Sequence, residues 1–186
     1  MSTDLYSVRH GQVAPNRLYR LCGNIDPPLT RIGRRQALDC SETIDNLPRI
    51  DAIYCSPLTR ASQTAVLATS YAFGMPSIIY DDRLRERGFG PLEGAFAPLK
   101  AKRIWSYDCS FTKSNYGEET IYDFELRTES FLEMLRANHP NQRVLVFSHG
   151  GVGAAIHALL DENNPYRGNY FKNFHMKNGD LVYFLL

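Results

Sequence analysis

Short apolar runs alternate along the chain with longer segments in which apolar residues recur every three or four positions. This alternation is typical of strands connected by helices. The apolar runs predict strands at 5–8, 52–56, 77–81, 143–151 and 181–186. The longer segments predict helices at 30–47, 57–73, 118–139 and 151–160. We therefore expect an α/β fold, a three-layer α/β/α sandwich around a mostly parallel sheet.

Two of the expected helices begin with polar residues that suit a helix N-terminus. Ser56 is placed as the N-cap of the helix at 57–73, with Pro57 at its first position. Glu118 and Glu119 are expected in the first turn of the helix at 118–139, where carboxylates interact favourably with the helix dipole.

Residues 83–117 do not follow this alternation. They are rich in glycine, proline and charged residues. A chain of 186 residues is of single-domain size, so we expect one domain over residues 1–186. We interpret 83–117 as a small irregular or helical cap within that domain, which would select the substrate. Its aromatic residues could line a pocket or pack the cap.

Composition and charge indicate which kinds of binding partner and which compartment to expect. The net charge is +1 and the basic residues are scattered, so nucleic acid is not an expected partner. No apolar segment has the length of a membrane span, and the opening residues do not resemble a signal peptide. The four cysteines form no C-x-x-C pair. We expect a cytoplasmic protein with reduced thiols.

Charged and imidazole side chains follow three of the expected strands. Arg9 and His10 end the first, Arg60 lies four residues after the second, and His149 follows the fourth. Ligands of open α/β sheets bind at the carboxyl ends of the strands, so these four side chains would gather if the strands are neighbours. Guanidinium groups and glycine-rich helix starts bind phosphate oxygens. The pattern predicts a phosphate pocket that contains its own nucleophile.

Two other interpretations compete with this one. A single histidine after a strand is often only a polar group in a turn. Histidine is also a common metal ligand, but two histidines gathered with Arg9 and Arg60 are poor surroundings for a cation, and no H-E-x-x-H motif is present. We expect no metal and no cofactor. The repetition at three strand ends favours a phosphate site.

Ordered motifs make the prediction more specific. The segments "VRHGQVAPN", "CGNIDPPLTRIGRRQA", "IYCSPLTRASQTA", "LRERGFGPLEG", "GEETIYDFELR" and "VLVFSHGG" occur in this order over almost the whole chain. They resemble the signature segments of the histidine phosphatase superfamily, which includes cofactor-dependent phosphoglycerate mutase. The resemblance implies metal-independent transfer of a phosphoryl group to a histidine.

The resemblance also implies roles for individual residues. His10 would be the nucleophile and become a phosphohistidine, and Glu86 would act as general acid and then base. The remaining implied catalytic residues, which would bind the phosphoryl group, are Arg9, Arg60 and His149. The implied substrate-binding residues are Asn16, Cys22, Gly23, Arg87 and Gly150. We expect Glu93 to be structural and His139 and His157 to be non-catalytic, and we leave His175 unassigned.

The branch of the family sets the expected reaction. Mutases are longer, and Phe89 and Ala97 depart from their pattern, whereas Arg87 matches it. We therefore expect a phosphomonoesterase that acts on a small phosphorylated metabolite. A mutase-type phosphoryl transferase and a weakly catalytic module that binds phosphorylated ligands are the alternatives.

Overall fold

The computed structural model describes residues 2–70, 72, 74–97, 114, 117–161 and 174–186. Five strands form one sheet in the order β3-β2-β4-β1-β5. Four of them run parallel, and the last strand pairs antiparallel with β1. The strands are β1 (Asp4–Arg9), β2 (Ala52–Cys55), β3 (Ile78–Tyr80), β4 (Arg143–Ser148) and β5 (Leu181–Leu185).

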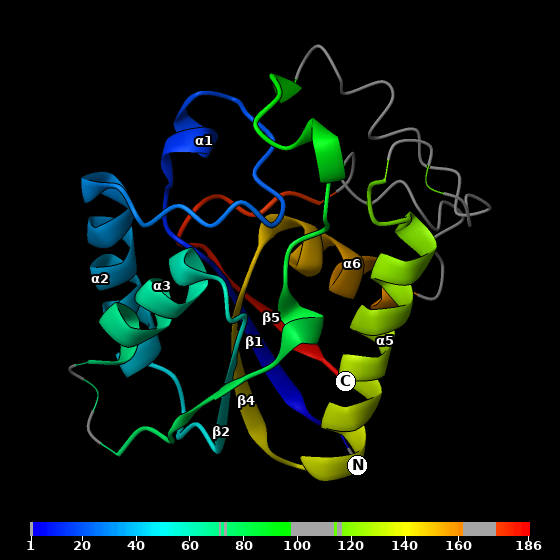
Figure 1. Ribbon diagram of the computed structural model, residues 1–186. Coiled ribbons are helices and arrows are strands. Elements are labelled where there is room, and N and C mark those ends of the chain that lie inside the picture. Colours follow the sequence, from blue (N-terminus) through cyan, green and yellow to red (C-terminus); the bar gives the residue numbers. More distant parts are fainter. Residues whose placement is uncertain (1, 71, 73, 98–113, 115–116, 162–173) are drawn as a thin grey trace.

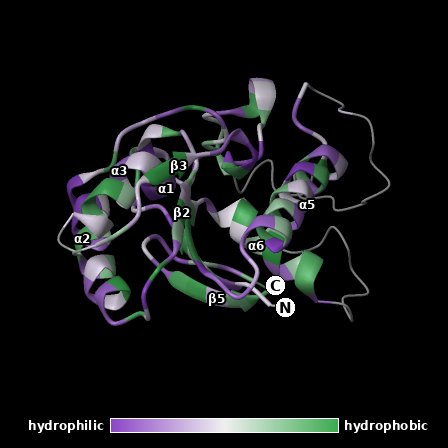
Figure 2. Cartoon of the chain, turned by 90° about the horizontal axis from the view of Figure 1, so that it is seen from below, coloured by the Kyte–Doolittle hydropathy of each residue, from purple (hydrophilic) through white to green (hydrophobic). Residues whose placement is uncertain are grey.

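Helices cover both faces of the sheet, as Figure 1 shows. One face packs against α2 (Arg31–Asp45) and α3 (Thr59–Thr69), and the other against α5 (Ile121–Asn138) and α6 (Gly150–Leu160). The central strand β4 is buried from its second residue onward, as expected of a parallel strand covered on both sides. The expected three-layer sandwich is confirmed. Seen from below in Figure 2, the two helix pairs lie on opposite sides of the strands.

The side chains of the central strands divide between two layers of hydrophobic core, one on each face of the sheet. Leu5, Val144 and Val146 point to the α5–α6 side, and Leu145 and Phe147 to the α2–α3 side. All five side chains are fully buried. Alternation of side chains across a strand sends neighbouring apolar residues into different layers, so a continuous apolar run fits a central strand.

One expected helix start is wrong. The helix expected at 57–73 begins at Thr59, and its N-cap residue, Leu58, makes no side-chain cap bond. The carboxylate of Asp26 accepts the Thr59 backbone N–H and the Thr59 hydroxyl, both at 2.7 Å. Asp26 therefore satisfies the helix N-terminus from another loop, in place of the expected Ser56.

The start of α5 also differs from the expectation. Thr120 is the N-cap, and its hydroxyl accepts the Asp123 N–H at 2.9 Å. Glu118 and Glu119 therefore precede the helix. Glu119 forms an ion pair with Arg127 at 2.6 Å instead of lying in a first turn.

The expected cap is described only in part. Residues 82–97 contain two short 3₁₀ turns, η1 (Asp82–Leu84) and η2 (Gly90–Leu92), and lie beside the carboxyl ends of the strands. Residues 98–113, 115 and 116, which make up the rest of the expected cap, lie outside the described residues. A four-residue helix, α1 (Ala14–Arg17), follows β1 near the same edge (Figure 1). Among the helices that the structure describes, none is long and apolar enough to cross a membrane.

Candidate active site

The adjacency of three strands gathers the predicted residues. β4 lies between β1 and β2 and runs parallel to both, so their carboxyl ends meet at one edge of the sheet. Arg9 ends β1, His10 follows it, and His149 follows β4. Arg60 lies in the first turn of α3, which follows β2. A cavity of about 690 Å³ opens at this edge.

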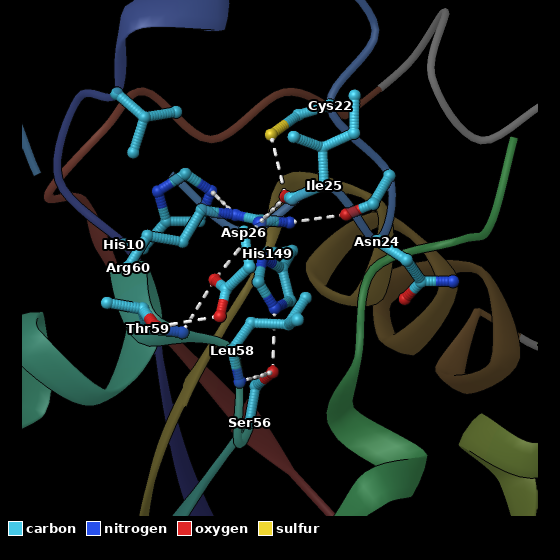
Figure 3. A network of polar contacts seen from close by, with 12 residues as sticks. His10, Cys22, Asn24, Ile25, Asp26, Ser56, Leu58, Thr59, Arg60 and His149 are labelled. Atoms are coloured by element: carbon cyan, nitrogen blue, oxygen red, sulfur yellow. Dashed lines mark hydrogen bonds and ion pairs between the residues drawn. The ribbon is translucent and has the colours of Figure 1, made fainter. Parts of the chain in front are cut away.

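His10 has a defined tautomer. Its Nδ1 lies 2.7 Å from the Gly11 carbonyl oxygen. Because a carbonyl oxygen only accepts, Nδ1 carries the proton and Nε2 keeps its lone pair. Arg60 donates its Nε–H to that Nε2 at 3.2 Å (Figure 3). The lone pair of Nε2 is therefore directed at a guanidinium group that could stabilise a phosphoryl group.

Arg60 is fully buried and held in place by backbone oxygens. It donates to the Ile25 carbonyl at 2.8 Å and to the Gly23 carbonyl at 2.7 Å. The Asp26 carboxylate lies 3.9 Å from the guanidinium and is itself engaged with Thr59. The charge of Arg60 is thus oriented by the loop after Cys22, which also forms part of the cavity lining.

Arg9 and the first turn of α6 form another wall. The Arg9 guanidinium donates to the Met176 carbonyl, and its Nε has no partner among the described residues. A Cβ on Gly150 would lie 3.3 Å from the Arg9 guanidinium carbon. Glycine therefore lets the helix N-terminus approach the arginine closely, so that both can contact one anion.

His149 is fully buried beside His10 and is not part of the cavity lining. Its ring centroid is 5.1 Å from that of His10, at an interplanar angle of 63°. Its Nε2 lies 2.8 Å from the Ser56 hydroxyl, whereas its Nδ1 is buried with no partner among the described residues. Ser56, the expected helix cap, thus contacts the second histidine and also accepts the Leu58 N–H at 3.4 Å.

Both histidines are held neutral by their surroundings. Burial lowers the pKa of His10 well below its usual 6.5, and the charges of Arg60 and Arg9 lower it further. Burial is also the main cause that lowers the pKa of His149, followed by the charge of Arg60. A neutral imidazole is the nucleophilic form.

The Glu86 side chain is held by backbone N–H groups at the wall of the cavity. One carboxylate oxygen accepts the Gly151 N–H at 3.1 Å, and the other accepts the Arg87 N–H at 3.0 Å. Arg127 supports this segment from α5 through the Glu86 carbonyl at 3.1 Å and the Arg85 carbonyl at 2.8 Å. The carboxyl group is therefore positioned at the N-terminus of α6, where it also lines the cavity.

The expected substrate-binding residues divide into two groups. Asn16, Cys22, Gly23 and Gly150 line the cavity. Arg87 is absent from its lining, is 5% exposed, and donates its Nε–H to the Glu119 carbonyl at 2.9 Å. Burial raises the pKa of the Cys22 thiol, so this cysteine is not a ready thiolate.

No group of three or more histidine, cysteine or acidic side chains in the described segments could hold a metal ion. The cationic surroundings of the two histidines are those of an anion site. The arrangement can accept a phosphoryl group on His10 Nε2, stabilise its charge with two arginines, and supply a carboxyl group for proton transfer.

The comparison with known families decides the assignment. The profile of the histidine phosphatase superfamily (branch 1) matches residues 5–184. The chain belongs to this superfamily. The expected family is confirmed.

Two phosphatase sequences and one solved phosphatase structure illustrate what this chain is similar to. A metal-independent phosphoserine phosphatase of Arabidopsis thaliana is 32% identical over 86% of this chain and 69% of its own length. A putative phosphoserine phosphatase 2 of Hydrogenobacter thermophilus is 35% identical over 84% of this chain and 77% of its own length. A mycobacterial glucosyl-3-phosphoglycerate phosphatase, solved in complex with VO3, superposes with a TM-score of 0.80 and 28% identity, over 97% of this chain and 91% of its own. The chain is accordingly a phosphatase of the phosphomonoesterase class.

The sequence analysis did not find every residue at this histidine phosphatase's site. The cavity lining also includes Tyr19, Arg20, Gln36, His175, Lys177 and Asn178. The last three come from the loop before β5, of which the sequence analysis named only His175 and left it unassigned. No local pattern in that loop indicates a site, because β5 brings it back beside β1.

Residues expected to be non-catalytic lie away from the cavity lining. The Glu93 carboxylate accepts the Asn24 and Ile25 N–H groups, both at 2.8 Å, and joins two loops of the site from outside. His139 is bonded to the Tyr54 hydroxyl at 2.9 Å. His157 stacks on Phe174 with centroids 4.4 Å apart.

Proposed function

We propose that this phosphatase hydrolyses a small phosphorylated metabolite through a phosphohistidine formed on Nε2 of His10. The observation that carries the proposal is the fixed tautomer of His10, with Nδ1 donating to the Gly11 carbonyl at 2.7 Å and Nε2 directed at Arg60. The low pKa of His10 keeps this nitrogen unprotonated at neutral pH.

In the first step, the Arg60 Nε–H moves from His10 Nε2 to a phosphoryl oxygen, which frees the Nε2 lone pair. Nε2 then attacks phosphorus, and the bond from phosphorus to the leaving oxygen breaks. Protonated Glu86 gives its proton to that oxygen, so the alcohol leaves neutral. Arg9 and Arg60 stabilise the charge on the phosphoryl oxygens in flight.

In the second step, the Glu86 carboxylate takes a proton from water, and the hydroxide attacks phosphorus. The bond to Nε2 breaks, inorganic phosphate leaves, and both Glu86 and His10 return to their starting forms. No step requires a metal, which accords with the similarity to the metal-independent phosphoserine phosphatase of Arabidopsis thaliana.

His149 would donate to the phosphoryl group through Nδ1. The Ser56 hydroxyl accepts the Leu58 N–H at 3.4 Å, so its own proton is free to go to His149 Nε2 at 2.8 Å. The proton of His149 then lies on Nδ1, a buried donor without an acceptor in the described part of the chain. Leaving such a donor unpaired costs about 1–3 kcal/mol, and a phosphoryl oxygen on His10 would remove that cost.

The choice of substrate would rest with the cap at 83–117. Glu86, Phe89 and Ala97 from its described part line the cavity. The engagement of Arg87 with the Glu119 carbonyl favours hydrolysis over the mutase alternative, which would need that arginine at the substrate. A cytoplasmic location accords with the free, buried thiols of Cys22, Cys40 and Cys55.

The test compares His10→Ala with the wild type on p-nitrophenyl phosphate and a panel of phosphorylated metabolites, with EDTA present throughout. We expect the wild type to turn over and the variant to lose at least about 10³-fold in kcat, because the nucleophile is absent. His157→Ala, a histidine of α6 outside the cavity, serves as the matched control and should keep its activity. Activity that survives in His10→Ala, or that disappears on chelation, would refute the mechanism.

A further inference from the structure

The loop before β5 clamps the end of β1. Gly179 donates its N–H to the Arg9 carbonyl, and Arg9 donates its N–H to the Asp180 carbonyl, both at 3.0 Å. Met176 anchors the loop and is 1% exposed, with its sulfur 2.3 Å from where a Cβ on Gly153 would lie. The loop is therefore a rigid neighbour of the nucleophile.

Asn178, in this loop, contacts two parts of the site at once. Its Nδ2 donates to the His10 carbonyl oxygen at 2.9 Å and to the Asn16 Oδ1 at 3.3 Å. The amide nitrogen has two hydrogens, so these two contacts use its donor capacity. What Asn178 could still offer the cavity is its carbonyl oxygen, which would repel an anion.

Two contacts, one of them with Asn178, determine which side of the Asn16 amide faces the cavity. Asn16 Oδ1 accepts the Val13 N–H at 3.3 Å as well as the Asn178 Nδ2. Its carbonyl oxygen is thus engaged with the protein, and the Nδ2 remains for a ligand in the cavity that Asn16 lines. An amide N–H₂ donates to phosphoryl oxygens, whereas the reversed amide would present an oxygen to them.

We propose that Asn178 is a positioning residue that orients the Asn16 amide to donate to the phosphoryl group and holds the backbone of His10. It acts through Asn16 and His10 and not by touching the phosphoryl group. The proposal rests on the proposed function only in taking this cavity as the phosphoryl site.

Asn178→Asp tests the orientation, because it keeps the shape of the side chain and replaces the donor with an acceptor. The new carboxylate faces Asn16 Oδ1, so the Asn16 amide should turn over and direct its oxygen at the ligand. We expect the affinity for inorganic phosphate and orthovanadate to fall by about tenfold, the order expected for one hydrogen bond to a charged group. Binding is measured by calorimetry, which requires no turnover, and KM and kcat are measured separately.

A double-mutant cycle with Asn16→Ala separates this mechanism from a simple charge effect. If Asn178 acts through Asn16, Asn178→Asp should weaken phosphate binding by about tenfold in the wild type but by less than about threefold in Asn16→Ala. A loss in kcat from the contact with His10 should persist in both. Asn141→Asp, at the opposite end of the sheet before β4, makes the same change in charge and should leave binding unchanged.

Equal losses of phosphate affinity in both backgrounds would overturn the proposal, as would an equal loss in Asn141→Asp. Asn178→Ala, which frees the Asn16 amide without repelling it, should give a smaller loss than Asn178→Asp, and the reverse order would also overturn it. Phosphate binding without turnover in the wild type would refute the proposed function, yet the cycle would still decide the role of Asn178. Thermal unfolding of every variant confirms that it is folded.

Discussion

At the scale of single residues, the site is organised by where protons lie. The Gly11 carbonyl accepts a hydrogen bond from the Nδ1–H of His10, and the Ser56 hydroxyl lies 2.8 Å from Nε2 of His149. Two backbone N–H groups bind the Glu86 carboxylate, so its orientation does not depend on another side chain. Each reacting group is thus oriented by a neighbour that takes no part in the chemistry, which reduces the reorganisation needed at the transition state.

Glu86→Gln separates proton transfer from phosphoryl binding. The amide keeps the size of the side chain but cannot protonate the leaving oxygen, so kcat on alkyl phosphates should fall by about 10²–10⁴-fold. p-Nitrophenolate leaves with little assistance, so its release in the first turnover should be nearly normal and appear as a burst. Stopped-flow measurements with both substrate types check this. Equal losses on both, without a burst, would mean that Glu86 is not the acid.

At the scale of elements, the sequence reveals where strands and helices are. It does not reveal which distant residues form hydrogen bonds with the backbone groups at their ends. Apolar runs predicted the five strands, and repetition at three of their ends predicted Arg9, His10, Arg60 and His149. Asp26 as the partner of α3, and Asn178 beside His10, could not be predicted in the same way. These contacts join residues that are 33 and 168 positions apart, and only the packed sheet brings them together.

The first turn of α6 must approach Glu86 closely. A Cβ on Gly151 would lie 2.1 Å from a Glu86 carboxylate oxygen, so Gly151→Ala should displace the carboxyl group. We expect a fall in kcat of about 10²-fold or more on alkyl phosphates, in the range of a lost general acid. Steady-state kinetics on the variant measure this, together with its phosphate affinity, which should change less.

Gly11→Ala provides the contrast at the element scale. Its Cβ would meet the Gly33 carbonyl oxygen at 2.2 Å, a backbone atom that cannot move aside as a side chain does. The strain there falls on the packing of α2 against the loop after β1 and should lower stability.

A Gly151→Ala protein that is unfolded, or folded with normal kcat, would contradict the assigned position of Glu86.

At the scale of the whole molecule, the fold buries two imidazoles among arginines at one edge of the sheet. The pKa of both His10 and His149 is lowered well below 6.5, mainly by burial. In the unfolded chain both return to about 6.5. As the pH falls through 6.5, the unfolded state therefore binds protons that the folded state does not, and the folded state loses stability.

The free energy of unfolding should thus decrease between pH 7 and pH 5 and carry no contribution from these histidines above pH 7. The slope should correspond to about one proton for each histidine. Urea unfolding at a series of pH values measures it, and His10→Asn with His149→Asn should make the profile flatter. A double variant with an unchanged slope would show that these histidines are not buried in the neutral form.

The most direct test of the account is to find the phosphoryl group on the protein. Glu86→Gln is mixed with p-nitrophenyl phosphate, quenched in alkali, in which phosphohistidine survives, and digested for mass spectrometry. The account predicts phosphate on the peptide that contains His10, at a level close to one per chain, because hydrolysis of the intermediate also needs Glu86. Phosphate on His149, on Cys22 or on no residue, in a sample whose burst shows that p-nitrophenolate was released, would contradict it.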